Sequence, residues 1–259
     1  MIDKDEVITS AINFFFKVNK KTSEEEKDYW NRFCAEKIAS KKFSELDYFF
    51  QKKVYTRMHN YFLSLLGNVK GKKILEAGCG SGYASMLLAQ AGAEITLLDN
   101  SRLALEYSKN LLRRVGLNRK KVKYVIADVR KLPFNKNAFD IVHNCGVIEH
   151  YEDEMILVIL REMTRVVCKY GQIVVVVPNL LSPEIVCRMI KYGKGSERYL
   201  SKKKLKKLMQ EAGLKKIEVK NANASVVPSC FPEKIHSQLS FLDDKLKFLD
   251  YLFYGRGLK

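Results

Sequence analysis

The sequence lacks any apolar run long enough to span a membrane. Its longest apolar stretches, such as Ile173 to Pro178, have the length of a β-strand, whereas a spanning helix needs about 20 residues. The first ten residues, MIDKDEVITS, lack the basic region, apolar core and cleavage site of a secretory signal. With only 5 prolines and no low-complexity tract, the composition is that of an ordinary globular protein. These absences predict a cytoplasmic protein without a transmembrane segment.

Cysteine is present, but not in the patterns that form disulfide frameworks or metal sites. The sequence has no CxxC pair and no cluster of cysteine with histidine, which are typical of zinc sites. The six cysteines are scattered along the chain as Cys34, Cys79, Cys145, Cys168, Cys187 and Cys230. We therefore expect reduced thiols and no metal.

Acidic residues are too few to balance the basic ones. Lys and Arg number 46 against 29 Asp and Glu, so the formal net charge is +17, and residues 181–259 alone contribute +9. Such an excess suits nucleic-acid binding, because basic side chains neutralise phosphates. However, Lys outnumbers Arg by 34 to 12, and bidentate phosphate recognition favours Arg. Two interpretations stay open: a solvated lysine-rich surface, which we favour, and a nucleic-acid interface.

Residues 1–70 have the apolar spacing of helices. Apolar side chains recur at helical intervals over residues 7–15, and Ser23 followed by three glutamates predicts a capped helix that runs to Lys42. A third helix is expected over residues 46–66, with Gly67 at its end. We therefore predict a helical cap of residues 1–70 before a second domain of residues 71–259.

From residue 71 onward, short apolar runs alternate with helical segments, which is typical of strand-helix-strand units around a parallel sheet. An amphipathic helix is expected at Ser201–Ala212, capped by Gly213. Residues 180–200 form an insert that could act as a lid. The expected strands are Lys73–Ala77, Glu94–Leu98, Val122–Ala127, Phe139–Asn144, Ile173–Val177 and Lys216–Val219. Ligands of such sheets bind beyond the carboxyl ends of the strands, so the residues there are the candidates for function.

The sharpest motif is ILEAGCGSGYAS at residues 74–85, with glycines at 78, 80 and 82 between an expected strand and a helix. Glycine allows a tight turn and close approach of a ligand, and the helix start offers unpaired N–H groups to an anion. A dinucleotide fingerprint would need glycine where this chain has Tyr83. Together with the acid Glu76, the loop suits a ligand that carries an amino acid group. The less favoured alternative is a turn that binds nothing.

Polar residues follow the next three strands. Asp99 ends the second strand, where a carboxylate can accept both ribose hydroxyl protons, although it could also cap the following helix. After the third strand, Asp128 and the Val129 amide could pair with the edge of an adenine. Asn144 lies at the mouth of the fourth strand, and His150 comes a few residues later.

Five segments, in their order and spacing, resemble the class I S-adenosylmethionine-dependent methyltransferases, and among them the group that includes the quinone-biosynthesis methyltransferases. The segments are ILEAGCGSG, the acid in LLDNS, IADVRKLPF, FDIVHNCGVIEH and GQIVVVVPN. The resemblance covers about residues 70–220. It implies an α/β fold with a doubly wound, mostly parallel, seven-stranded Rossmann-like sheet and helices on both faces. The seventh, antiparallel strand has one candidate, Phe253–Leu258.

The resemblance also implies S-adenosylmethionine as the cofactor and assigns residues to its parts. The methionine part would be held by Glu76, Gly78, Gly80 and Gly82, with Cys79 in the same loop. Asp99 and Asn100 would hold the ribose, Asp128 and Val129 the adenine, and Asn144 would form the floor near the sulfonium.

Methyl transfer from a sulfonium is an in-line displacement, so the protein mainly aligns donor and acceptor and excludes water. A base for the acceptor proton is the one group it could add. His150 is the first candidate, because its unperturbed pKa lies near neutral pH; an equal alternative is that it only shapes the pocket wall or caps the helix at Asp153. His143, inside the strand, is expected in the core.

The acceptor is not encoded in these motifs. The leading hypothesis is a small-molecule methyltransferase, with the acceptor atom and the oligomeric state open. The alternatives are an RNA methyltransferase, steered by the lysines at 202–207, 215 and 216, and a scaffold that binds the cofactor without transfer. Trp30, Tyr29 and Phe33 could line an acceptor pocket, although helix packing is the favoured explanation for them.

Overall fold

A single seven-stranded sheet organises the described part of the chain. The computed structural model describes residues 23–40, 60, 62–114, 122–179, 182–185, 187, 197–198, 200–222, 238, 242–245 and 252–259. The strand order is β3-β2-β1-β4-β5-β7-β6, and only β7 runs antiparallel to its neighbours. The strands are β1 (Lys73–Ala77), β2 (Glu94–Asp99), β3 (Val122–Ile126), β4 (Phe139–Cys145), β5 (Val167–Pro178), β6 (Lys215–Asn221) and β7 (Leu252–Leu258).

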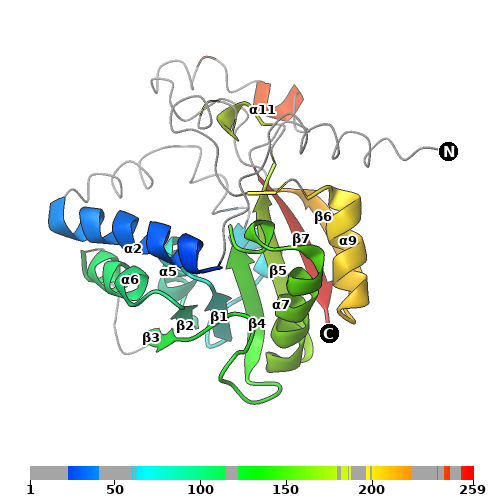
Figure 1. Cartoon of the computed structure of the whole chain (residues 1–259). Coiled ribbons are helices and arrows are strands. Elements are labelled where there is room, and N and C mark those ends of the chain that lie inside the picture. The colour runs from blue at the N-terminus through cyan, green and yellow to red at the C-terminus, as the bar shows by residue number, and fades with distance from the viewer. Residues whose placement is uncertain are drawn as a thin grey trace.

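Helices cover both faces of the sheet (Figure 1). On one face lie α5 (Tyr83–Gln90) and α6 (Arg102–Arg114), with α2 (Ser23–Ser40) packed on α6. On the other face lie α7 (Asp153–Val166) and α9 (Lys202–Glu211). Successive strand residues point to opposite faces, so each face has its own apolar core. The short η2 (Ile148–His150) follows β4, and α11 (Leu242–Lys245) precedes β7.

The predicted strands are confirmed, with small shifts at their ends. The candidate seventh strand is also confirmed: β7 lies between β5 and β6 and pairs antiparallel with both. β5 is longer than expected, because it begins at Val167 and includes polar residues that sequence alternation does not identify. The doubly wound, mostly parallel fold is therefore as expected.

The helical predictions are confirmed where the structure describes them. α2 begins at Ser23 and ends at Ser40, close to the expected segment, and residues 62–66 are helical. Residues 7–15, most of 46–61 and most of the 180–200 insert lie outside the described residues. Within the described ranges, no helix is both long and apolar enough to cross a membrane.

The α9 helix packs closely on β7 because glycine stands at the contact. Ser201 caps α9 by accepting a hydrogen bond from the Lys204 N–H at 3.1 Å, while Leu205 and Met209 turn to the sheet and are fully buried. A Cβ at Gly255 would lie 2.5 Å from the Met209 sulfur and 3.0 Å from the Leu205 Cδ2. The absence of a side chain at Gly255 therefore sets the distance between α9 and the sheet.

We expect Gly255→Ala to lower the free energy of unfolding by about 1–3 kcal/mol, because the added methyl overpacks this contact. Urea denaturation measures the loss. Gly257→Ala should cost less, since its nearest contact would be 3.0 Å, to the Leu214 Cβ. In a Met209→Ala background the Gly255→Ala cost should shrink. If the effects of Gly255→Ala and Met209→Ala on the free energy of unfolding simply add, contact with Met209 is not what limits the packing at Gly255.

Candidate functional site

The glycine loop, residues 78–82, leaves the carboxyl end of β1 and is tied to the end of β2. The N–H groups of Gly78 and Cys79 both donate to the Leu98 carbonyl, at 2.8 and 2.9 Å. All three glycines have positive φ, at 79°, 49° and 68° for Gly78, Gly80 and Gly82, a region that other residues occupy at a cost of about 1–2 kcal/mol. The glycines are therefore required by the backbone of this turn.

The three glycines differ in the space around them. A Cβ at Gly82 would lie 2.4 Å from the Ser108 hydroxyl of α6, and one at Gly78 would lie 2.8 Å from a Val147 methyl. At Gly80, among the described residues, the new atom would meet only the ring of Trp30, at 3.9 Å. Gly82 and Gly78 thus serve close packing, whereas Gly80 faces a space bordered by an aromatic ring.

Asp99 lies beside this loop, as its sequence position predicts. Its Oδ2 accepts a hydrogen bond from the Gly80 N–H at 2.8 Å, and its Oδ1 accepts one from the Ser101 N–H at 2.9 Å. Burial raises the pKa of Asp99, and these backbone bonds oppose that shift. The carboxylate therefore joins the glycine loop to the end of β2. The residue that caps α6 is Ser101 rather than Asp99, because the Ser101 hydroxyl accepts a hydrogen bond from the Ala104 N–H at 3.0 Å.

Glu76 is a buried acid directly beneath the loop. Its carboxylate is 2% exposed and accepts hydrogen bonds from Ser85 of α5, whose hydroxyl lies 3.1 Å from the His143 Nε2. The Oε2 of Glu76 has no hydrogen-bond partner among the residues that the structure describes. Burial raises the pKa of Glu76 to about 8 and lowers that of His143 to about 3. The expected core position of His143 is confirmed, with Phe62 against its ring at 5.3 Å.

The turn after β3 holds a residue that sequence reasoning did not single out. Arg130 grips the Asp128 carboxylate from its Nε and Nη2, and its N–H donates to the Asp128 Oδ1 at 2.8 Å. This pairing lowers the pKa of Asp128. Val129 is buried, and its Cγ1 lies 3.6 Å from the position of a Cβ at Gly78, so the turn abuts the glycine loop. The sequence DVR at residues 128–130 could have predicted this pairing, because side chains two residues apart in a turn can bond to each other.

The two candidate residues at the end of β4, Asn144 and His150, differ in their exposure to solvent. Asn144 is fully buried, and its side-chain amide contacts the Met163 sulfur of α7 at 3.6 Å. The Oδ1 of Asn144 has no hydrogen-bond partner among the residues that the structure describes, and the role of Asn144 near the sulfonium stays a prediction. His150 ends η2 and is partly exposed. The adjoining Tyr151 carbonyl accepts a hydrogen bond from Arg198, which also pairs with Glu152.

Helix α2 lies against the glycine-loop side of the site. The Ser101 hydroxyl donates to the Asn31 side chain at 2.6 Å, which anchors α2 beside Asp99. Trp30 contacts Phe33 edge-to-face at 5.5 Å, and both rings pack on the core. Burial, aided by Asp99, raises the pKa of the Cys34 thiol to about 12. The favoured explanation of helix packing is thus confirmed for Trp30 and Phe33, and the Tyr29 side chain lies outside the described residues.

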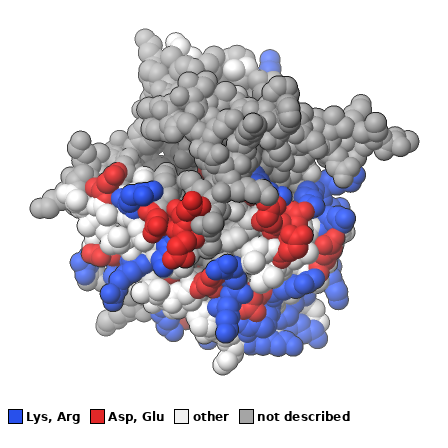
Figure 2. All heavy atoms as spheres, in the orientation of Figure 1, with Lys and Arg blue, Asp and Glu red and all other residues white. Residues whose placement is uncertain are grey.

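Basic side chains gather on the side of the molecule where α9 lies (Figure 2). Lys206, Lys215 and Lys216 are exposed there. Other lysines have partners within the chain: Lys204 pairs with Asp153, Lys207 with Glu211 and Lys220 with Glu218. Acidic and basic side chains are interspersed on the face shown, which is the pattern of a solvated surface. In the described residues, no group of three or more His, Cys, Asp or Glu side chains could hold a metal.

In the folded protein Glu76 keeps its proton up to about pH 8, whereas in the unfolded protein it releases the proton at about pH 4.5. The contribution of Glu76 to the free energy of unfolding should therefore fall progressively as the pH rises from 4.5 to 8. We expect Glu76→Gln to gain in melting temperature relative to the wild type as pH rises through this window. Paired scans at equal pH measure it and cancel the opposite contribution of His143. Glu106→Gln, which changes an exposed carboxylate on α6, is the matched control. A difference that stays constant with pH would contradict a neutral buried Glu76.

Comparison with known proteins agrees with this geometry. Residues 75–175 match the family model described as "Methyltransferase domain". The chain is 34% identical over 99 residues to cycloartenol-C-24-methyltransferase of Arabidopsis thaliana, covering 38% of this chain and 29% of that protein. It is 34% identical over 85 residues to the ubiquinone biosynthesis O-methyltransferase of Coxiella burnetii, covering 33% and 35%. The chain thus spans about a third of the length of these curated relatives.

A solved structure shares the fold over most of both chains. The structure of a SAM-dependent methyltransferase from Aquifex aeolicus superposes with a TM-score of 0.54 at 16% identity, covering 77% of this chain and 88% of that one. The matched family model spans β1 to β5, which includes the glycine loop, Asp99 and the Asp128 turn. Residues 75–175 thus match a methyltransferase domain, and the shared fold is the one that the resemblance to the class I S-adenosylmethionine-dependent methyltransferases implies.

Proposed function

We propose that this protein transfers the methyl group of S-adenosylmethionine to a small-molecule acceptor. The observation that carries the proposal is the joining of the glycine loop to Asp99 through the Gly80 N–H, at the carboxyl ends of β1 and β2. Ligands of open α/β sheets bind in this place. The relatives named for cycloartenol and for ubiquinone biosynthesis support a small molecule as the acceptor.

The residues present fit this cofactor. S-adenosylmethionine carries an ammonium and a sulfonium, and the site holds the buried acid Glu76 and the half-buried acid Asp99. The unpartnered Glu76 Oε2 is a ready acceptor for an ammonium or for a water that bridges to it. Gly80 leaves room for the cofactor to approach the loop, and Trp30 borders that room. We assign Glu76 and the loop from Gly78 to Gly82, Cys79 included, to the methionine part.

The remaining assignments follow the strands. Asp99 and Asn100 would hold the ribose, and Asp128 and Val129 the adenine. Asp128 is already paired with Arg130, so we assign base recognition to the Val129 backbone and to the outer face of this ion pair.

The cofactor, when bound, supplies a methyl group on positively charged sulfur, which is already activated for displacement. The protein's task is then to orient the acceptor and to exclude water. His150 lies after β4, in the turn that Arg198 braces through the Tyr151 carbonyl. We propose that its imidazole accepts the acceptor proton.

The acceptor side is assigned to the cap and the insert. We propose that residues 1–70 form a cap on the domain of residues 71–259, and that residues 180–200 form a lid. Helix α2 supports this, because it is anchored next to Asp99 through Asn31. The cytoplasmic location expected from the sequence and a nucleic-acid acceptor both remain predictions, the latter the less favoured.

We expect Asp99→Asn to weaken S-adenosylhomocysteine binding at least tenfold, because the carboxamide loses the charge and one of the two acceptor oxygens. Calorimetry gives the dissociation constant, and fluorescence of Trp30, the chain's single tryptophan, gives an independent signal. Glu94→Gln is the control, since its exposed carboxylate lies at the opposite end of the same strand. Wild-type protein that binds no S-adenosylhomocysteine, or an unchanged affinity in Asp99→Asn, would overturn the proposed function.

For His150→Gln we expect unchanged S-adenosylhomocysteine affinity and a fall of about 10²–10⁴-fold in kcat, the usual contribution of a general base. The measurement is transfer of labelled methyl to a panel of hydroxyl, amine and activated-carbon acceptors. If His150→Gln keeps the wild-type kcat with a hydroxyl or amine acceptor, His150 takes no part in the proton transfer and only lines the pocket wall.

A further inference from the structure

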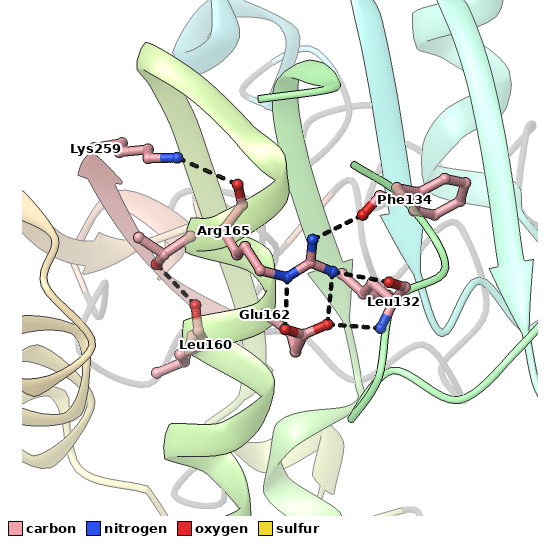
Figure 3. Close-up of polar contacts among 7 residues, drawn as sticks. Leu132, Phe134, Leu160, Glu162, Arg165 and Lys259 are labelled. Carbon is pink, nitrogen blue, oxygen red and sulfur yellow. Dashed lines mark hydrogen bonds and ion pairs between the residues drawn. The ribbon is translucent and has the colours of Figure 1, made fainter. Parts of the chain in front are cut away.

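The connection between β3 and β4, residues 127–138, contains the Asp128–Val129 turn, which is proposed above to hold the adenine, yet it has no regular secondary structure. Its backbone groups therefore need partners other than a helix or sheet ladder. Figure 3 shows that these partners are two side chains near the end of α7, Glu162 and Arg165. They bond to backbone groups of Leu132 and Phe134. Neither side chain belongs to the motifs that define the site.

One ion pair satisfies three backbone groups of this connection. The Glu162 Oε2 accepts from the Leu132 N–H at 2.8 Å. The Arg165 guanidinium donates to the Leu132 carbonyl at 2.8 Å and to the Phe134 carbonyl at 2.7 Å. The same guanidinium donates to both Glu162 oxygens, at 2.8 and 2.9 Å. The guanidinium thus makes four hydrogen bonds through its three nitrogens, a geometry that the planar arginine fork allows and a lysine ammonium does not.

The connection is also fastened at its far end. The Asn137 N–H donates to the Arg165 carbonyl at 3.1 Å, and Asn137 itself has a left-handed φ of 63°. The Lys259 ammonium donates to the Asn137 side chain and to the Val167 carbonyl, both at 2.8 Å. The end of α7 thus holds the connection at residues 132–134 and again at residue 137.

The held segment leads directly to the cofactor side. Leu132 is 3% exposed, and the Phe134 ring meets Phe139 edge-to-face at 4.9 Å. Two residues before the held segment, Arg130 grips Asp128, and Val129 lies against the glycine loop at Gly78. A displacement of Leu132 would therefore move the turn that abuts that loop.

We propose that Arg165 and Glu162 are positioning residues that hold the Asp128–Val129 turn in the conformation that reads the adenine base. The proposal rests on the proposed function. The two side chains act through the backbone at residues 132–134 and do not touch the cofactor. Their effect is preorganisation: a turn that is already ordered loses less conformational freedom when the base binds.

The test compares base discrimination in the full-length protein. Dissociation constants are measured for S-adenosylhomocysteine and for its inosine analogue, in which the 6-amino group of the base is replaced by oxygen. The wild type should prefer the adenine compound at least tenfold. Arg165→Lys keeps the charge but loses the fork, so we expect about tenfold weaker S-adenosylhomocysteine binding and a preference reduced to about twofold.

Matched variants separate positioning from folding. Arg161→Lys, exposed on the same helix, should keep wild-type values for both ligands. Glu162→Gln, which retains an acceptor for the Leu132 N–H but loses the ion pair, should give an intermediate preference and serves if Arg165→Lys does not fold. Hydrogen exchange should quicken in residues 127–138 while α7 stays protected. A purely structural role would lower the melting temperature without changing the preference.

The outcomes distinguish this proposal from the one it rests on. Wild-type protein that binds neither compound overturns the proposed function and this inference with it. Wild-type protein that binds both compounds equally, or variants that keep the full preference, overturns the positioning role alone. Loss of the preference in Arg165→Lys but not in Arg161→Lys supports it.

Discussion

The hydrogen bond from the Gly80 N–H to the Asp99 carboxylate is the contact on which the rest of the site depends. It joins the loop after β1 to the end of β2, and the Leu98 carbonyl adds two further bonds to the same loop. Parallel pairing of β1 with β2 brings these strand ends together. The loop can form only with left-handed backbone at its glycines, and only this conformation brings the Gly80 N–H to Asp99. The glycines and the acid are therefore required together.

Burial of acidic groups gives the site its electrostatic character. Glu76 and Asp99 both have raised pKa values because the fold removes them from water. The thiols of Cys34, Cys79 and Cys145 gather near these acids, and burial raises their pKa values as well. A site in which negative charge is costly becomes favourable for a cationic ligand, since the ligand supplies the missing counter-charge. This is the physical link between the fold and the proposed cofactor.

The far side of the sheet supports the site rather than forming it. Helix α7 holds the β3–β4 connection through Arg165 and Glu162, and Arg198 braces the turn that carries His150. Both arginines donate to backbone carbonyls of irregular segments. Segments without a ladder of their own need such partners, so the order of these two turns depends on side chains that other segments supply.

Periodicity and motif spacing were enough to identify the parallel strands, the α9 helix and the position of Asp99, because these features depend on local alternation and on strand ends. They were not enough for the longer β5 or for the Arg130 and Arg165 pairings. The segment before Ile173 joins β5 because Val167 pairs with Phe139 of β4, and Gln172 pairs with both β4 and β7 across a register shift. Likewise, a carbonyl that accepts from an arginine about 30 residues away leaves no periodic signal in the chain.

By itself, the sequence determined the class of fold, the left-handed glycine turn and the acid at the end of the second strand. Each of these follows from steric limits on the backbone or from apolar spacing, which act over a few residues. Only the tertiary structure decided that Asn144 turns its amide to Met163, that Trp30 borders Gly80, and that α7 holds the β3–β4 connection at Leu132. Those arrangements depend on which faces of distant elements meet, and packing of the two cores selects them.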